Sequence, residues 1–85
     1  MKNIYIYTDG GCRNNQIPEK REGYGSFVVT STPYPNHETG RIASQHLSFG
    51  NVTNNVAEYK SLLAALDYCI NEFIPIHRFI QIQNL

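Results

Sequence analysis

Alternation of hydrophobic and polar positions predicts four strands along the chain. The first is Lys2 to Thr8, in which isoleucines alternate with tyrosines. Because both faces of this segment are apolar or aromatic, we expect a central strand that is covered on both sides. Gly23 to Thr30 and Arg41 to Phe49 predict the second and third strands. Alternating isoleucine and glutamine within Pro75 to Gln83 predicts the fourth.

A run of helix formers between the third and fourth strands predicts a helix that extends to Phe73. Thr53 is a good N-cap, because its hydroxyl can accept a free backbone N–H of the first turn. Pro75 is expected to stop the helix. Large apolar side chains recur at three- and four-residue steps, which predicts a helical face that packs on the sheet. Its contacts are expected through Leu62, Leu63 and Leu66.

The order of these elements predicts an α/β fold with a mixed sheet, β-β-β-α-β. Short loops join the first three strands into an antiparallel meander. The helix then forms a right-handed crossover to a fourth strand, parallel to the first and next to it. The first strand is therefore expected in the interior of the sheet, in a single domain over residues 1–85.

Composition excludes several classes of protein. The chain has 85 residues, a formal net charge of zero and two cysteines without metal-site spacing, which argues against a basic nucleic-acid arm, a zinc site or a disulfide framework. No signal peptide or membrane span is visible, so we expect no membrane association and a cytoplasmic location. His37, in the connection between the second and third strands, is expected to be exposed.

Two carboxylates stand out at predicted element boundaries. Asp9 follows the first strand and precedes two glycines, a pattern that by itself indicates no more than a turn. Glu58 has apolar neighbours along its helix, and it could complete a capping box if Asn55 were the N-cap. The crossover topology would bring Asp9 and Glu58 together, and such oxygen ligands suit magnesium or manganese. Both interpretations of Glu58 stay open on spacing alone.

The motifs around these carboxylates resemble the type 1 ribonuclease H family. They are Tyr7-Thr8-Asp9-Gly10-Gly11-Cys12 with Asn15, Gly23-Tyr24-Gly25, and Thr53-Asn54-Asn55-Val56-Ala57-Glu58. The resemblance implies a ribonuclease H-like fold and a metal-dependent endonuclease that cleaves the RNA strand of an RNA/DNA hybrid. It implies that Asp9 and Glu58 are catalytic metal ligands for magnesium, with manganese as an alternative. It also implies hybrid contacts from Gly10, Gly11, Cys12, Asn15, Asn54 and Asn55.

The sequence differs from the family in the acidic residues that complete members carry in the later part of the domain. Complete members carry a third carboxylate just past the fourth strand and a fourth near the C-terminus, and here Asn84 and Leu85 follow that strand. We therefore expect an incomplete ribonuclease H-like domain that is inactive alone. The alternatives are a non-catalytic nucleic-acid-binding module and a degenerate structural remnant. We also expect an uncovered face on the first strand and self-association through the open edge of the fourth.

Overall fold

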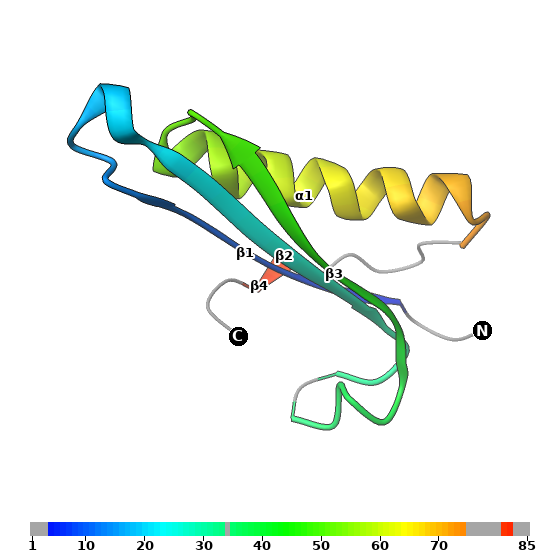
Figure 1. Ribbon diagram of the computed structural model, residues 1–85. Coiled ribbons are helices and arrows are strands. Elements are labelled where there is room, and N and C mark those ends of the chain that lie inside the picture. The colour runs from blue at the N-terminus through cyan, green and yellow to red at the C-terminus, as the bar shows by residue number, and fades with distance from the viewer. Residues whose placement is uncertain (1–3, 34, 75–80, 83–85) are drawn as a thin grey trace.

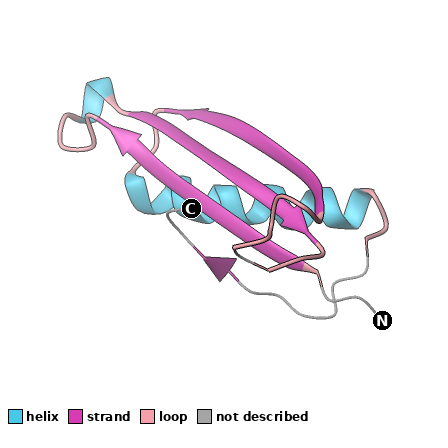
Figure 2. Cartoon of the chain, turned by 90° about the horizontal axis from the view of Figure 1, so that it is seen from below, coloured by secondary structure: helices cyan, strands magenta, loops and turns pink. Residues whose placement is uncertain are grey.

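A three-stranded antiparallel meander with one helix across its face forms the body of the protein (Figures 1 and 2). The computed structural model describes residues 4–33, 35–74 and 81–82. The strands are β1 (Tyr5–Arg13), β2 (Glu22–Thr30) and β3 (Arg41–Gly50), and the helix is α1 (Asn54–Asn71). A short 3₁₀ helix, η1 (Pro18–Lys20), lies between β1 and β2. The predicted meander and crossover helix are confirmed.

A fourth segment, β4 (Gln81–Ile82), lies beside β1 and gives the strand order β3-β2-β1-β4. Its two residues pair in parallel with Ile6 and Tyr7, so β1 is interior as predicted. Two residues are a fragment of the expected strand. The rest of the predicted segment Pro75 to Gln83 lies outside the described residues, and a complete parallel fourth strand stays a prediction.

The first strand is longer than its sequence predicts. β1 continues through Asp9 to Arg13, which pairs with Glu22 at the far end of β2. The predicted strand end at Asp9 is therefore wrong. Glycines usually weaken a strand, but here Gly10 lies opposite Gly25 in the ladder, where two residues without side chains let the sheet approach α1 closely. Pairing with β2 has overridden the local turn preference.

The helix begins where the N-cap prediction places it. The Thr53 hydroxyl accepts the backbone N–H of Val56 at 3.3 Å, so Thr53 is the N-cap and Asn54 the first helical residue. Asn55 is consequently not the N-cap, and the capping-box interpretation of Glu58 is wrong. The last helical residue is Asn71, two positions before the predicted end. Phe73 follows with a left-handed φ of 54°.

The helix packs on the sheet mainly through small residues. The buried positions are spaced by four, at Ala57, Ser61, Ala65 and Cys69. Leu63 is 44% exposed, and Leu62 and Leu66 are half-buried, although Leu66 still touches the core. The predicted packing face is therefore wrong for Leu62 and Leu63, whereas Leu66 contacts the core as predicted. Only small side chains let α1 lie this near to the glycines of β1 and β2.

The core fills the space between the sheet and α1. It consists of Ile4, Ile6, Phe27, Val29, Ala65 and Cys69. Ser61, which is fully buried, satisfies its hydroxyl by donating to the Ala57 carbonyl oxygen at 2.8 Å. Burial raises the pKa of the Cys69 thiol, which therefore stays neutral within the core. Among the described residues, no helix is long and apolar enough to cross a membrane.

The opposite face of β1 is covered at Tyr7, contrary to expectation. Tyr7 is 1% exposed, and its ring lies 5.7 Å from the ring of His37, centroid to centroid. His37 is itself half-buried, so its predicted exposure is also wrong. The Thr30 hydroxyl donates to the His37 carbonyl oxygen at 2.8 Å and accepts the backbone N–H of Thr32 at 3.1 Å. These bonds fold the connection between β2 and β3 over the strand.

Replacing Ala65 by leucine should destabilise the fold, because the added carbons have no room between α1 and the sheet. The expected loss is about 1–3 kcal/mol in the free energy of unfolding, measured by urea denaturation. Ala64→Leu is the matched control on the same helix, at a half-buried position with access to the surface. Equal effects of the two variants would contradict the close packing of the buried face.

Candidate active site

Asp9 lies in the middle of β1, half-buried and opposite Ser26 of β2. Neighbouring side chains in a strand point to opposite faces. Ile6 belongs to the core under α1, so Gly10, in phase with it, faces the helix and Asp9 faces the other side of the sheet. The carboxylate of Asp9 thus leaves β1 on the face that α1 does not cover.

Gly10 joins the strand of Asp9 to the helix of Glu58. A Cβ atom placed on Gly10 would lie 2.8 Å from the Glu58 backbone nitrogen and Cα, and 2.8 Å from the Ala57 carbonyl oxygen. All three neighbours are backbone atoms, so no side-chain rotation could relieve the clash. The absence of a side chain at Gly10 therefore permits the contact that places Asp9 and Glu58 on adjoining backbone segments.

Glu58 is half-buried near the start of α1 and belongs to a short chain of polar contacts. The Asn54 side-chain amide donates to Glu58 Oε1 at 3.4 Å. The backbone N–H of Asn54 in turn donates to Asn15 Oδ1 at 3.0 Å. Asn15, Asn54 and Glu58, three of the residues singled out in the sequence, are therefore brought together, with Asn15 supplying an acceptor to the open first turn of the helix.

The two carboxylates start from different sides of β1, so they can meet only around its edge. The last described pair between β1 and β4 joins Tyr7 to Ile82, two residues before Asp9. Beyond that pair, the described part of the chain places no strand against the edge of β1 on this side. A shared cation stays a prediction.

Of the remaining residues predicted to contact a hybrid, Gly11 and Cys12 have structural roles and Asn55 is exposed. Gly11 is buried beneath Tyr24, whose hydroxyl oxygen would lie 2.5 Å from an added Cβ. The thiol of Cys12 donates to the Val52 carbonyl oxygen at 3.1 Å and so ties β1 to the segment that leads into α1. Asn55 is exposed at the first turn of the helix, where its amide is accessible to a ligand.

Sequence reasoning missed the contacts that order the segment between β1 and β2, which it described only as a polar loop. Asn51 donates its side-chain amide to the Pro18 carbonyl oxygen at 2.7 Å. Arg21 Nε donates to the Asn15 carbonyl oxygen at 2.9 Å. These bonds fix Asn15 between η1 and α1. Asn51 and Pro18 are 33 residues apart, too far for any local pattern to indicate their contact.

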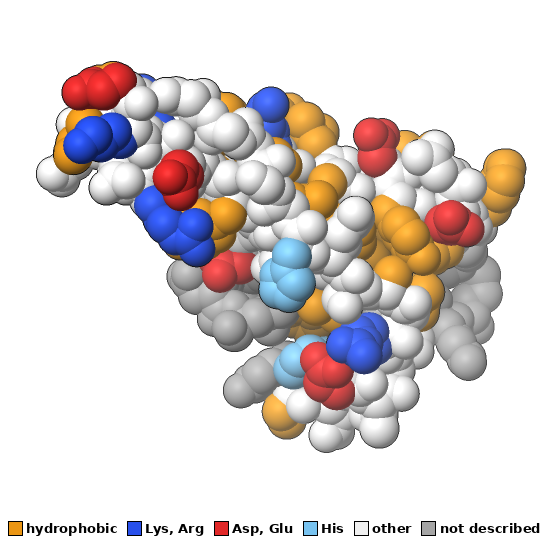
Figure 3. Space-filling model, viewed as in Figure 1, with side chains coloured by type: hydrophobic (Ala, Val, Ile, Leu, Met, Phe, Trp, Pro, Cys, Tyr) orange, Lys and Arg blue, Asp and Glu red, His pale blue; other side chains and the backbone are white. Residues whose placement is uncertain are grey.

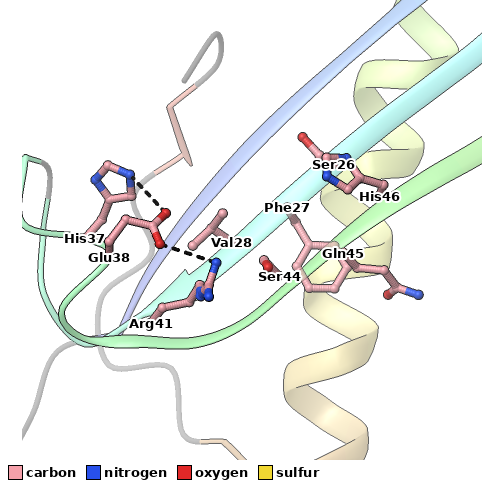
Figure 4. Close-up of a pocket in the computed structure, with 9 residues that line it drawn as sticks. All are labelled: Ser26, Phe27, Val28, His37, Glu38, Arg41, Ser44, Gln45 and His46. Atoms are coloured by element: carbon pink, nitrogen blue, oxygen red, sulfur yellow. Dashed lines mark ion pairs between the residues drawn. The ribbon is translucent and has the colours of Figure 1, made fainter.

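A row of polar residues across the sheet was also missed. Asp9 pairs with Ser26, and Ser26 pairs with His46 of β3. Ser26 and His46 line a shallow pocket of about 330 Å³ with Val28, His37, Glu38 and Arg41 (Figure 4). Glu38 contacts Arg41 at 3.3 Å and His37 at 3.7 Å. Two strand spacings separate His46 from Asp9 by roughly 10 Å, which is too far for one shared ion.

The side chains around Asp9 and Glu58 limit which metal ion could bind there. Within residues 4–33, 35–74 and 81–82 no three His, Cys, Asp or Glu side chains gather closely enough to hold a metal. Two carboxylates still suit a single magnesium ion, which usually takes one or two of them and completes its shell with water or phosphate oxygens. By their chemistry Asp9 and Glu58 suit one magnesium ion, and an ion shared between them stays a prediction.

Comparisons with curated proteins identify mycobacterial relatives. No protein-family model matches the chain. The bifunctional protein Rv2228c of Mycobacterium tuberculosis is 42% identical over 64 residues, which are 75% of this chain and 15% of that protein. An uncharacterised protein of Mycobacterium bovis, Mb2253c, matches with the same identity and coverage. The chain therefore spans only a small part of the curated relatives that it matches.

Solved structures match nearly the whole chain. The N-terminal RNase H domain of Rv2228c, solved as a fusion with maltose-binding protein, has a TM-score of 0.73 and 27% identity, over 100% of this chain and 54% of that one. LC11-RNase H1 in complex with an RNA/DNA hybrid has a TM-score of 0.70 and 29% identity, over 98% and 55%. RNase H1 from Halobacterium salinarum supports the fold alone, with a TM-score of 0.71 and 24% identity over 98% and 55%.

Replacing Asn15 by alanine should loosen the start of α1, because the backbone N–H of Asn54 would lose its acceptor. We expect a loss of about 0.5–2 kcal/mol in unfolding free energy, the range for lost helix caps, and faster hydrogen exchange at the Asn54 amide. Gln16→Ala is the control, since Gln16 is an exposed neighbour of Asn15. An unchanged exchange rate at Asn54 in the Asn15 variant would refute this role.

Proposed function

We propose that this chain provides the Asp9 and Glu58 half of a hybrid-cleaving site. The reason is that it has the ribonuclease H1-like fold and resembles the type 1 ribonuclease H family over its whole length. Its relatives in structure include an enzyme solved with an RNA/DNA hybrid. The proposed substrate is accordingly an RNA/DNA hybrid, and the proposed reaction is hydrolysis of its RNA strand.

One observation carries the proposal: the backbone contact between Gly10 and Glu58. This contact, which only glycine permits at position 10, joins two carboxylate-bearing segments. The amide of Asn54 then restrains the Glu58 carboxylate. Two carboxylates on segments held in contact are the kind of donors that magnesium takes, which supports a metal-binding role.

In the proposed mechanism, Asp9 and Glu58 would hold one magnesium ion, and manganese could replace it. Such an ion, when bound, activates water and neutralises charge on the phosphate. Asn54 orients the Glu58 carboxylate, and Asn15 fixes the helix start from which both project. The exposed Asn55 amide can both donate to and accept from a ribose 2′-hydroxyl, the group that distinguishes RNA from DNA.

The other members of the proposed contact surface act through shape. Gly10 and Gly11 leave no side chain beside Asp9, so a sugar or phosphate could approach the β1 backbone closely. Cys12 holds the segment before α1 in place through Val52. We further propose that the sheet is completed by a parallel fourth strand of which Gln81 and Ile82 are part, and that the protein acts in the cytoplasm.

Two carboxylates do not make a complete cleavage site. Fixing two metal ions requires ligands from several elements, and no third acidic or histidine side chain joins Asp9 and Glu58 in the part of the chain that the structure describes. We therefore propose that these 85 residues alone bind a hybrid weakly without cleaving it. The same observation favours the second candidate function, a non-catalytic nucleic-acid-binding module.

Titration with magnesium should shift the backbone NMR resonances around Asp9 and Glu58 more than those elsewhere. The reason is that the two carboxylates supply the only proposed protein ligands. Asp9→Asn and Glu58→Gln should each abolish these shifts. Glu19→Gln, which removes an exposed acid from η1, should leave them unchanged. Shifts centred on other residues would rule out the assigned metal site.

A labelled RNA/DNA hybrid tests the activity directly, in magnesium and in manganese. We expect salt-sensitive binding, because phosphate contacts release counterions, and no RNA cleavage above that of the Asp9→Asn control. Cleavage by the parent chain that Asp9→Asn abolishes would show that two carboxylates suffice, and the incomplete-site proposal would fall. If the chain binds single-stranded and double-stranded nucleic acids of any kind as tightly as it binds the hybrid, hybrid recognition is refuted.

A further inference from the structure

The outer edge of β3 is open. This strand stands at one end of the order β3-β2-β1-β4, and among the described residues no segment pairs with its outer side (Figure 2). Alternate residues of an edge strand direct their backbone N–H and C=O groups away from the sheet, so β3 offers hydrogen bonds to a further strand. A strand added beside β4, at the opposite end of the sheet, would leave this edge open. The helix packs chiefly on β1 and β2 and does not block it.

The open edge lacks the residues that usually prevent strands from pairing. From Ile42 to Gly50 the sequence contains no Lys, Arg, Asp, Glu or Pro. Edge strands are commonly protected by such residues or by bulges. Register shifts lie only at the two ends of the ladder with β2, which leaves a regular segment from Ala43 to Ser48 that we call the β3 edge. Figure 3 shows mostly uncharged side chains over the middle of β3.

We propose that the β3 edge pairs antiparallel with the same segment of a second copy of this chain. The two-fold axis passes between the two Gln45 residues, which lie opposite each other. Ala43 of one copy then lies opposite Leu47 of the other, and Ser44 lies opposite His46. Each of these two pairs occurs twice. Because both copies use the same edge, the contact closes into a dimer and joins the two sheets into one.

The side chains of the β3 edge fit this register on both faces of the sheet. Leu47 packs against the core on the side of α1, and Ala43, four positions away in the strand, shares its face. Both are half-buried, so their pairing extends an apolar layer that already exists. On the other face, the exposed Ser44 hydroxyl can form a hydrogen bond with the exposed His46 imidazole.

A neighbouring register is less favourable. Moving the two-fold axis to His46 would set imidazole against imidazole and would place Leu47 opposite the amide of Gln45. Both the apolar pair and the hydroxyl–imidazole pair would be lost. The sequence of the β3 edge is thus complementary to itself about Gln45, which favours a second copy of the chain over an unrelated strand.

The proposed dimer differs from association through the edge of β4, which the sequence alone predicts. Its two-fold axis stands perpendicular to the sheet, so both α1 helices lie on one face and both Asp9 side chains on the other. Pairing through β4 would leave the β3 edge open, and it would not depend on the residue at position 45. Substitution of Gln45 therefore distinguishes the two modes of association.

Sedimentation velocity across a concentration series tests the proposal on the intact chain. The parent should pass from a monomer of 9.7 kDa to a dimer as concentration rises. Gln45→Lys sets two ammonium groups opposite each other and Gln45→Glu sets two carboxylates, so each should weaken dimerisation by about 5-fold or more. Gln16→Lys is the matched control, since Gln16 is an exposed glutamine outside β3, and it should leave dimerisation unchanged.

An equimolar mixture of Gln45→Lys and Gln45→Glu tests the register itself. Opposite charges then meet at the two-fold axis, so the mixture should form a mixed dimer at least as stable as that of the parent. Circular dichroism confirms that each variant is folded, as expected for changes at an exposed position. A parent that stays monomeric at all concentrations, a dimer unaffected by either Gln45 variant, or a mixture as weak as its components would overturn the proposal.

Discussion

The close approach of α1 to β1 and β2 is the constraint on which the rest of the structure depends. Gly10 and Gly25 on the strands face Ala57 and Ser61 on the helix, and the backbone of Gly10 lies against that of Glu58. Larger side chains at this seam would lift the helix from the sheet and carry Glu58 away from Asp9. Helix–sheet packing and the candidate metal site thus have one cause.

The same constraint explains why the large apolar side chains of α1 are outside. Because the sheet accepts only small residues, leucine, tyrosine and isoleucine lie on the remaining circumference of the helix. The helix is therefore apolar on two sides, a pattern typical of elements placed between two layers. The described residues provide one of those layers, the sheet.

Local sequence patterns predicted the three long strands and the N-cap at Thr53, because each depends on residues close together in the chain. They failed for the packing face of α1. Periodicity identifies two apolar stripes, and the larger residues carry the stronger signal, whereas the fit to the sheet selects the smaller ones. The end of β1 was misplaced since pairing with β2 extends it past Asp9. Asn15 and Asn54 could be suggested by family resemblance, but their contact spans too much sequence for a local rule.

The seam between Gly10 and Glu58 also has a consequence for the order of folding. The pairings of β1 with β2 and of β2 with β3 join neighbouring segments, so their loops close at little entropic cost. Docking of α1 on β1 joins segments from opposite ends of the described chain and is the slower, more topologically demanding step. Until α1 docks, the sheet face that carries Ile6, Phe27 and Val29 is exposed to water. A nascent sheet with that face uncovered is the species most prone to aggregate, so the rate of helix docking sets how long this protein is vulnerable during its synthesis.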